Sequence, residues 1–198
     1  MMSSAESGAP AKSAGRRRLH TRTIVVEVYE RDDGQFDLEA RLTDVKDHDL
    51  PLASGLRPAG TPVHDMRLHV SVDAAFNVTE AAGHSSTVPY PGICETIGPA
   101  YGVLKGLNLM NKFRAAVMQA IGGQRGCTHL SELAGVLPTA AVQAAAGIRR
   151  QDPNVQPFQL DRCHALVTDG EGVRRFYPRW YRSKPAGAAQ HNEVIDPA

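Results

Sequence analysis

Two segments in the first half of the chain alternate apolar and polar residues and predict antiparallel hairpins. Residues 23–30 are β-branched and aromatic, and an alternating segment follows at 36–43, after the turn residues 32–34. A second alternating pair covers 66–73 and 76–78. Because successive side chains of a strand point to opposite faces, each hairpin has one apolar and one polar face. We therefore expect an antiparallel sheet of about four strands.

The second half of the chain changes to helical patterns. Apolar residues predict helices over 93–107, 108–121 and 130–146, with glycines at 122–123 between the last two. Around 165–177 the residues predict a late strand pair with an Asp/Gly turn. The expected fold class is α+β, an antiparallel sheet of two hairpins plus a late C-terminal strand pair, covered on one face by about three helices.

The two ends of the chain lack such patterns. Residues 1–19 are rich in Ser, Ala and Gly before a run of arginines, and residues 183–198 are mostly polar or small. Segments of this composition bury too little apolar surface to fold. We expect a disordered arm at 1–19, a single α+β domain at 20–182 and a flexible tail at 183–198.

Charge and composition exclude several classes of function. The chain has 22 Lys and Arg against 21 Asp and Glu, a net charge of +1, which predicts no nucleic-acid partner. No segment has the apolar length of a membrane helix or of a signal peptide. Three widely spaced cysteines, Cys94, Cys127 and Cys163, do not form a disulfide framework. We expect a cytoplasmic protein with a small-molecule substrate and no membrane partner, and apolar helix stripes that allow a homodimer.

Residues 122–129 hold the densest group of reactive residue types. They read Gly-Gly-Gln-Arg-Gly-Cys-Thr-His, and Thr128 is expected to cap the helix that follows. Cys127 and His129 would then lie at the positive end of that helix, where the macrodipole favours a thiolate and a neutral imidazole. These are the forms that a nucleophile and a general base require. The same residues also fit a glycine-rich turn with a buried cysteine.

Several motifs together resemble a known family. They are Pro-Tyr-Pro-Gly-Ile-Cys at 89–94, Gly-Gly-x-x-Gly-Cys-Thr-His-Leu at 122–130, Asp-x-Cys-His-Ala at 161–165 and Tyr-Pro-Arg-Trp at 177–180. In this order they resemble the bacterial domain-of-unknown-function family 2889 over roughly 65–181. The resemblance implies no particular reaction, although an association of such proteins with the degradation of aromatic compounds favours an aromatic substrate.

Three chemistries are open for the segment around Cys127. A zinc site would use Cys127 and His129 with Cys94, although no Cys-x-x-Cys unit is present. A thiol nucleophile needs a base, and His69, on the wet face of its strand, would have to complete the pair. Acid/base catalysis without a metal would use His129 as the base, His69 as its partner across the sheet and Cys127 as a secondary acid. Other residues of suitable ligand type are Cys163, His164 and His64.

We favour the third chemistry and expect a lyase rather than another enzyme class. It would cleave a carbon–carbon bond of a phenolic aromatic compound without a cofactor, by retro-aldol loss of formaldehyde or by decarboxylation. Tyr90, Arg114 and Glu95 are the expected substrate-binding residues. Glu95 also fits a helix cap and Arg114 a surface ion pair. The alternatives are a zinc-dependent hydrolase or lyase and a non-catalytic ligand-binding or scaffold protein.

Overall fold

The structure, a computed structural model of the 198-residue chain, describes residues 15–148, 152 and 154–183. The chain divides into two compact units, 1–148 and 149–198, and each is described by itself. The arm predicted at 1–19 and the tail predicted at 183–198 lie mostly outside the described residues. Within the described part of the arm, Arg18 donates two hydrogen bonds to Asp47. A single domain over 20–182 stays a prediction.

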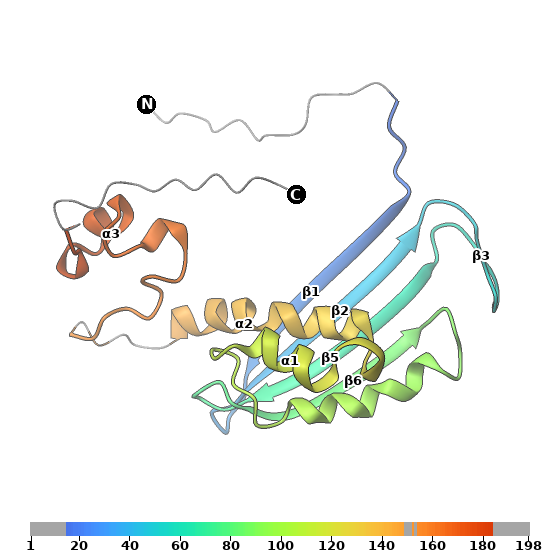
Figure 1. The fold of residues 1–198 in the computed structure, drawn as a ribbon, viewed down its shortest axis with the longest axis horizontal. Coiled ribbons are helices and arrows are strands. Elements are labelled where there is room, and N and C mark those ends of the chain that lie inside the picture. Colours follow the sequence, from blue (N-terminus) through green and yellow to red (C-terminus); the bar gives the residue numbers. More distant parts are fainter. Residues whose placement is uncertain (1–14, 149–151, 153, 184–198) are drawn as a thin grey trace. The chain divides into compact units, whose positions relative to one another are not determined.

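The first unit is built on a four-stranded antiparallel sheet with the order β1–β2–β5–β6 (Figure 1). Two short strands form a separate hairpin between β2 and β5. The strands are β1 (His20–Glu30), β2 (Phe36–Lys46), β3 (Leu50–Leu52), β4 (Gly55–Arg57), β5 (Pro62–Val72) and β6 (Val78–Thr87). The predicted antiparallel sheet of two hairpins is confirmed.

One face of this sheet is covered and the other is open. Along β2, Leu38, Ala40 and Leu42 are buried, while Glu39 and Arg41 between them are exposed. The alternation read from the sequence therefore reflects a real difference between the two faces. We call them the covered face and the open face.

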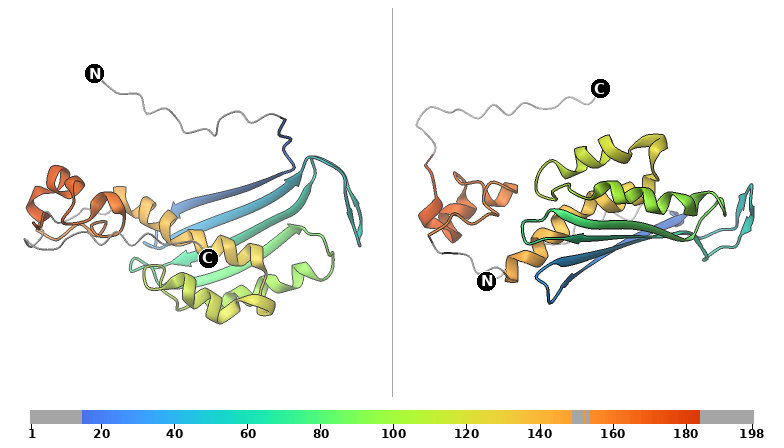
Figure 2. Two further views of the ribbon diagram at one scale, coloured as in Figure 1. Left: turned by 45° about the horizontal axis from the view of Figure 1, so that its top comes forward. Right: turned by 90° about the horizontal axis from the view of Figure 1, so that it is seen from below.

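Three helical segments lie on the covered face (Figure 2). They are the 3-10 helix η1 (Cys94–Leu104), α1 (Phe113–Ile121) and α2 (Thr128–Ile148), and α2 continues through Pro138. η1 approaches β6 so closely that a Cβ on Gly98 would lie 2.2 Å from the carbonyl oxygen of Gly83. The predicted cover of about three helices is confirmed. Among the described helices, none is both long and apolar enough to cross a membrane.

The late strand pair predicted around 165–177 is wrong. The described part of the second unit contains short helices instead, namely η3 (His164–Leu166), α3 (Glu171–Phe176) and η4 (Pro178–Trp180). The Asp/Gly segment that resembles a hairpin turn instead starts α3, with Gly170 before the helix and Glu171 in its first turn. An acidic residue at that end is favourable to a helix. The Asp and Gly residues that predicted a hairpin turn therefore mark the start of a helix.

Candidate functional site

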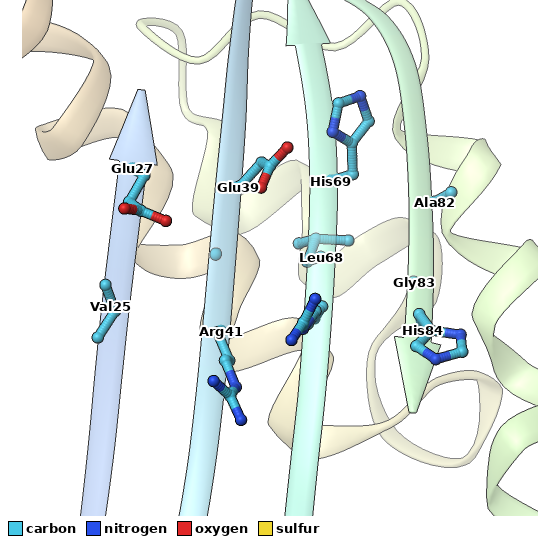
Figure 3. A pocket seen from close by; sticks show the side chains of 11 residues that line it. Val25, Glu27, Glu39, Arg41, Leu68, His69, Ala82, Gly83 and His84 are labelled. Carbon is cyan, nitrogen blue, oxygen red and sulfur yellow. The ribbon is translucent and has the colours of Figure 1, made fainter. Parts of the chain in front are cut away.

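A hollow of about 530 Å³ lies on the open face of the sheet (Figure 3). It is lined by acidic and basic side chains that include Glu39, Arg41 and His69. Arg41 is already paired with Asp65 through two hydrogen bonds of 2.8 and 2.7 Å. Exposed charges of this kind are ordinary for the wet face of an antiparallel sheet. The stronger candidate for chemistry is on the covered face.

A buried carboxylate lies near one end of the covered face. Asp44 continues the buried row of β2 two residues beyond Leu42, and its side chain is 5% exposed. The strand register places Asp44 between Arg22 on β1 and His64 on β5. A buried carboxylate requires donors to replace water. The two neighbouring strands supply them.

Hydrogen-bond donors occupy both oxygens of Asp44. Arg22 donates from Nε to Oδ1 and from Nη2 to Oδ2, each at 2.8 Å, in a bidentate pair. His20 Nε2 lies 2.8 Å from Oδ1, and His64 Nδ1 lies 3.0 Å from Oδ2. Burial raises the pKa of Asp44, but the hydrogen bonds from Arg22 and His20 and the charge of Arg22 outweigh burial and hold the pKa well below its ordinary value. Asp44 is therefore ionised at neutral pH.

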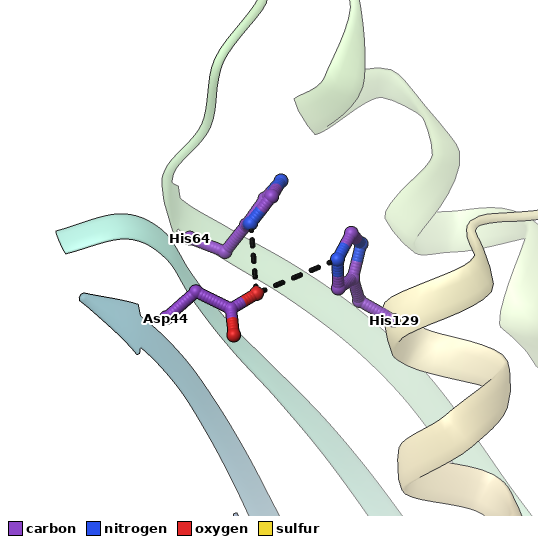
Figure 4. A group of neighbouring side chains, drawn as sticks. All are labelled: Asp44, His64 and His129. Carbon is purple, nitrogen blue, oxygen red and sulfur yellow. Dashed lines mark hydrogen bonds and ion pairs between the residues drawn. The ribbon is translucent and has the colours of Figure 1, made fainter. Parts of the chain in front are cut away.

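His129 reaches the same carboxylate from the first turn of α2. Its Nε2 lies 3.5 Å from Asp44 Oδ2, and its ring lies against the ring of His64 with centroids 3.9 Å apart (Figure 4). Glu132, three residues further along α2, accepts a hydrogen bond of 2.6 Å from Nη1 of Arg22. Arg22 thus connects the start of the helix to the sheet, and the two histidines are held over one carboxylate.

The protonation of His64 follows from these contacts. Burial lowers the pKa of His64 and the neighbouring His129 lowers it further, which outweighs the opposite effect of Asp44. The imidazole is therefore neutral at neutral pH. Because the ionised carboxylate only accepts, Nδ1 carries the proton that faces Asp44, and Nε2 is the basic nitrogen.

Cys127 occupies the position directly before α2. Its carbonyl accepts the N–H of Ser131 at 2.9 Å, so the expected cap at Thr128 is wrong and Thr128 is the first residue of the helix. Cys127 Sγ lies 3.8 Å from His129 Nδ1. Burial raises the pKa of the thiol, but the contact with His129 and the backbone N–H groups of Leu130 and His129 outweigh burial, so the pKa is lowered.

Tyr101 and Gly126 fix the backbone on which Cys127 sits. The hydroxyl of Tyr101, a fully buried residue of η1, donates to the carbonyl of Cys127 at 2.7 Å and accepts from its N–H at 3.1 Å. A Cβ on Gly126 would lie 2.2 Å from the carbonyl oxygen of Ile121, so this turn requires glycine. The backbone that carries the thiol is therefore fixed by Tyr101 and by the close turn at Gly126.

The histidines and the thiol border a pocket of about 460 Å³. Its remaining wall is largely apolar and includes an aromatic ring, that of Tyr90, which is 54% exposed. The wall residues with apolar or sulfur-containing side chains are Met66, Pro89, Ile93, Cys94 and Ile97. A lining of this kind suits a mostly apolar molecule with a polar end.

The structure brings some of the predicted site residues together and separates others. Cys127, His129, Tyr90 and Cys94 border one pocket. His69 lies on the open face, where its Nε2 contacts the hydroxyl of Ser71 at 3.2 Å. The expected pairing of His69 with His129 across the sheet is therefore wrong, because the sheet itself separates the two side chains.

The two other predicted substrate-binding residues are also away from the pocket. Arg114 on α1 donates to the carbonyl of Gly135 at 2.7 Å and so connects two helices. Glu95 accepts the N–H of Gly92 at 2.8 Å and closes the start of η1. Both side chains thus hold the fold, and neither is among the residues that border the pocket.

Sequence reasoning missed Asp44 and Arg22 and named His64 only as one of several residues of ligand type. A usable signal was present. Asp44 follows Leu42 by two residues, and His64 precedes Met66 by two, so both continue rows of buried apolar side chains. A polar residue in such a row has to find a partner inside the protein. Two of them on neighbouring strands predict a buried polar contact.

A metal ion is the other group that these side chains suggest. Asp44, His64 and His129 offer donor atoms that all lie within 4.8 Å of one another. Among the described residues, no such group contains Cys127 or Cys94, which the predicted zinc site required. Arg22 already forms a bidentate pair with Asp44, and its positive charge opposes a cation at that carboxylate. The donor set is therefore better suited to hydrogen bonding.

Comparison with known proteins identifies the family. A family model described as "Protein of unknown function (DUF2889)" matches residues 20–143. This range includes the first hairpin, which the resemblance over 65–181 left out, and it ends before the motifs at 161–165 and 177–180. No curated protein and no solved structure matches the chain. The matched range contains Arg22, Asp44, His64 and His129. Because the match covers more than half of the sequence, the chain belongs to the DUF2889 family of proteins of unknown function.

Proposed function

We propose that the protein is a lyase that cleaves a carbon–carbon bond of a phenolic aromatic compound by acid/base chemistry without a cofactor. One observation carries the proposal: His64 and His129 lie against the buried, ionised Asp44 at the border of a partly apolar pocket. A carboxylate that holds one ring nitrogen of an imidazole leaves the other nitrogen available as a base.

The proposed reaction starts with removal of a proton from a hydroxymethyl group on the side chain of the substrate. The oxygen's electron pair then forms the carbonyl of formaldehyde, and the electron pair of the broken carbon–carbon bond moves into the conjugated ring system. The acceptor of that pair is a quinone methide, which forms when the para-phenolate oxygen of the substrate expels a hydroxide or alkoxide from the carbon attached to the ring, and this group leaves with a proton as water or an alcohol. The quinone methide accepts the electron pair of the broken bond, becomes a phenolate again and takes up a proton. Loss of carbon dioxide from a carboxylate uses the same electron sink. Every electron pair is accounted for within the substrate.

The two histidines divide the proton transfer. The sequence alone favours His129 as the base; we propose Nε2 of the neutral His64 in its place, because Nδ1 of His64 is hydrogen-bonded to Asp44. His129 lies between Asp44 and the thiol of Cys127, and from this position it returns a proton to the product. Arg22 balances the charge of Asp44 and keeps it oriented. Proton transfer by a positioned side chain accelerates such steps by about 100- to 10,000-fold.

The apolar wall of the pocket supports an aromatic substrate. Ile93 and Ile97 offer apolar contact to a ring, and Tyr90 is exposed enough to stack on it.

The cysteines support a cytoplasmic location. None of the three cysteines is in a disulfide, which supports a place in the reducing cytoplasm.

Turnover of a panel of phenolic compounds with hydroxymethyl or carboxyl side chains tests the proposal. Formaldehyde and carbon dioxide release are measured with wild type, His64→Ala, His129→Ala and His69→Ala, before and after treatment with a chelator. We expect release that survives the chelator, is lost in the first two variants and is kept in the third. Release that needs a stoichiometric metal, or that survives both His64→Ala and His129→Ala, contradicts it. Absence of release across the panel favours the ligand-binding alternative.

A further inference from the structure

β1 is an edge strand with an open outer side. Among the described residues it pairs with β2 alone, along all 11 of its residues and without a register shift (Figure 1). Natural proteins usually protect such edges with proline, a bulge, a very short strand or charged residues, above all lysine. β1 contains no proline, lysine or bulge, and its charged residues Arg22, Glu27 and Glu30 leave the row Ile24, Val26 and Val28 without a charge. A long and regular edge of this kind is a site for pairing with another strand.

The opposite edge of the sheet is treated differently. β6 is contacted by η1, and its first residue, Val78, exchanges backbone hydrogen bonds of 2.8 Å with Leu107 and Gly106. On β1, by contrast, no described segment other than β2 pairs with the strand. The protein therefore protects one edge of the sheet and leaves the other available.

The charges along β1 indicate which partner fits. The start of the strand carries His20 and Arg22, after Arg18, and each of these basic residues also contacts an acidic residue of its own chain; the end carries the acidic Glu27 and Glu30. A second β1 in antiparallel orientation places the basic start of one copy against the acidic end of the other. The strand is thus complementary to itself about a two-fold axis.

We propose that β1 pairs with β1 of a second copy of this chain and joins the two sheets into one. In the register centred on Val26, that residue faces its own counterpart, Ile24 faces Val28, and Arg22 faces Glu30. On the open face Thr23 then meets Tyr29. Each apolar residue of the half-buried row Ile24, Val26 and Val28 meets another apolar residue, which is the criterion that fixes a strand register. The inference depends on the strand alone and not on the proposed reaction.

The first experiment measures the mass of the full chain in solution over a wide range of concentrations. We expect a dimer that Glu30→Lys weakens about tenfold in Kd, because two contacts with Arg22 become repulsive. Glu80→Lys, the same change at an exposed position of β6, is the matched control and leaves the dimer unchanged. A monomer at all concentrations, or a dimer that both variants weaken equally, overturns the proposal.

The second experiment tests the register and does not depend on the strength of the dimer. Thr23→Cys and Tyr29→Cys are combined in one chain, which is then oxidised and analysed by non-reducing electrophoresis. The two positions are about 20 Å apart along one strand, so they can form a disulfide only between two chains. We expect a covalent dimer from the double variant and none from either single variant or wild type. Absence of the covalent dimer, or equal crosslinking of the single variants, contradicts the register.

Discussion

Each face of the sheet carries a histidine beside an aspartate, yet only one of the two pairs is enclosed. On the covered face, His64 lies 3.0 Å from Asp44, with side chains 16% and 5% exposed. On the open face, His69 lies 3.9 Å from Asp37, with side chains 38% and 22% exposed. Water screens the second pair and makes its contribution small. The first pair lies in a medium of low dielectric, where hydrogen bonds and charges have larger effects.

The partners of the two aspartates differ as well. Asp44 is held by the guanidinium fork of Arg22. Asp37 accepts a hydrogen bond of 2.6 Å from the neutral hydroxyl of Ser71, and Arg31 lies 3.5 Å away. The comparison teaches that burial and charge compensation, rather than the residue pair itself, make an Asp–His contact a candidate for catalysis.

Replacement of the histidines should have the largest effect on turnover, and it should show which face of the sheet carries the chemistry. We expect His64→Ala and His129→Ala each to reduce turnover in the formaldehyde and carbon dioxide assay by about 100-fold or more, because each removes a proton-transfer group. His69→Ala should stay close to wild type. Thermal unfolding of each variant shows whether it remains folded. An equal loss in the folded His69→Ala variant would place the chemistry on the open face.

Loss of the buried charge should have the next largest effect, on stability. Asp44→Asn leaves the guanidinium of Arg22 and the imidazole of His20 without their acceptor charge. We expect a decrease of about 3 kcal/mol in the free energy of unfolding in urea. Asp37→Asn on the open face should decrease it by less than about 1 kcal/mol. Equal decreases would mean that the covered face gives Asp44 no special environment.

The sheet and the Cys127–His129 segment could be predicted from sequence because both depend on local patterns. Alternation along 36–43 determines which residues share a face, and the residues at 126–129 form the turn before α2 and its first two residues. Alternation does not say which residue of another element will lie over a face. For that reason the alternating pattern allowed the prediction that His69 is the catalytic partner of His129, although the sheet lies between the two side chains.

Asp44 could not be placed by local reasoning because its partners come from far along the chain. Arg22 precedes it by 22 residues and His64 follows it by 20. His129 lies beside Asp44 only because α2 packs on the sheet. The error in the second unit has another cause. Gly and Asp occur both in hairpin turns and before helices, and at 169–172 the short segment offers no periodicity to decide between them.

The pH dependence of stability should give a smaller effect with a defined sign. Because the pKa of His64 is lowered in the folded state, the unfolded chain takes up a proton first as the pH falls below the ordinary histidine pKa of about 6.5. The folded protein therefore loses stability through His64 below that pH. We expect the advantage of wild type over His64→Gln in unfolding free energy to shrink from about pH 7.5 to about pH 5.5. A difference that stays constant over this range would show that His64 titrates as it does in the unfolded chain.

The smallest expected effect concerns the thiol. The contact with His129 helps to lower the pKa of Cys127, so removing the imidazole should raise that pKa. The rate of alkylation by iodoacetamide, followed for the peptide that contains Cys127, should then rise at a higher pH in His129→Gln than in wild type, because the thiolate is the reactive form. His69→Gln removes an imidazole from the open face and should leave this profile unchanged. If the two variants shift the profile equally, the effect is a general change of charge. If neither shifts it, the helix start alone tunes the thiol, and His129 serves Asp44 rather than Cys127.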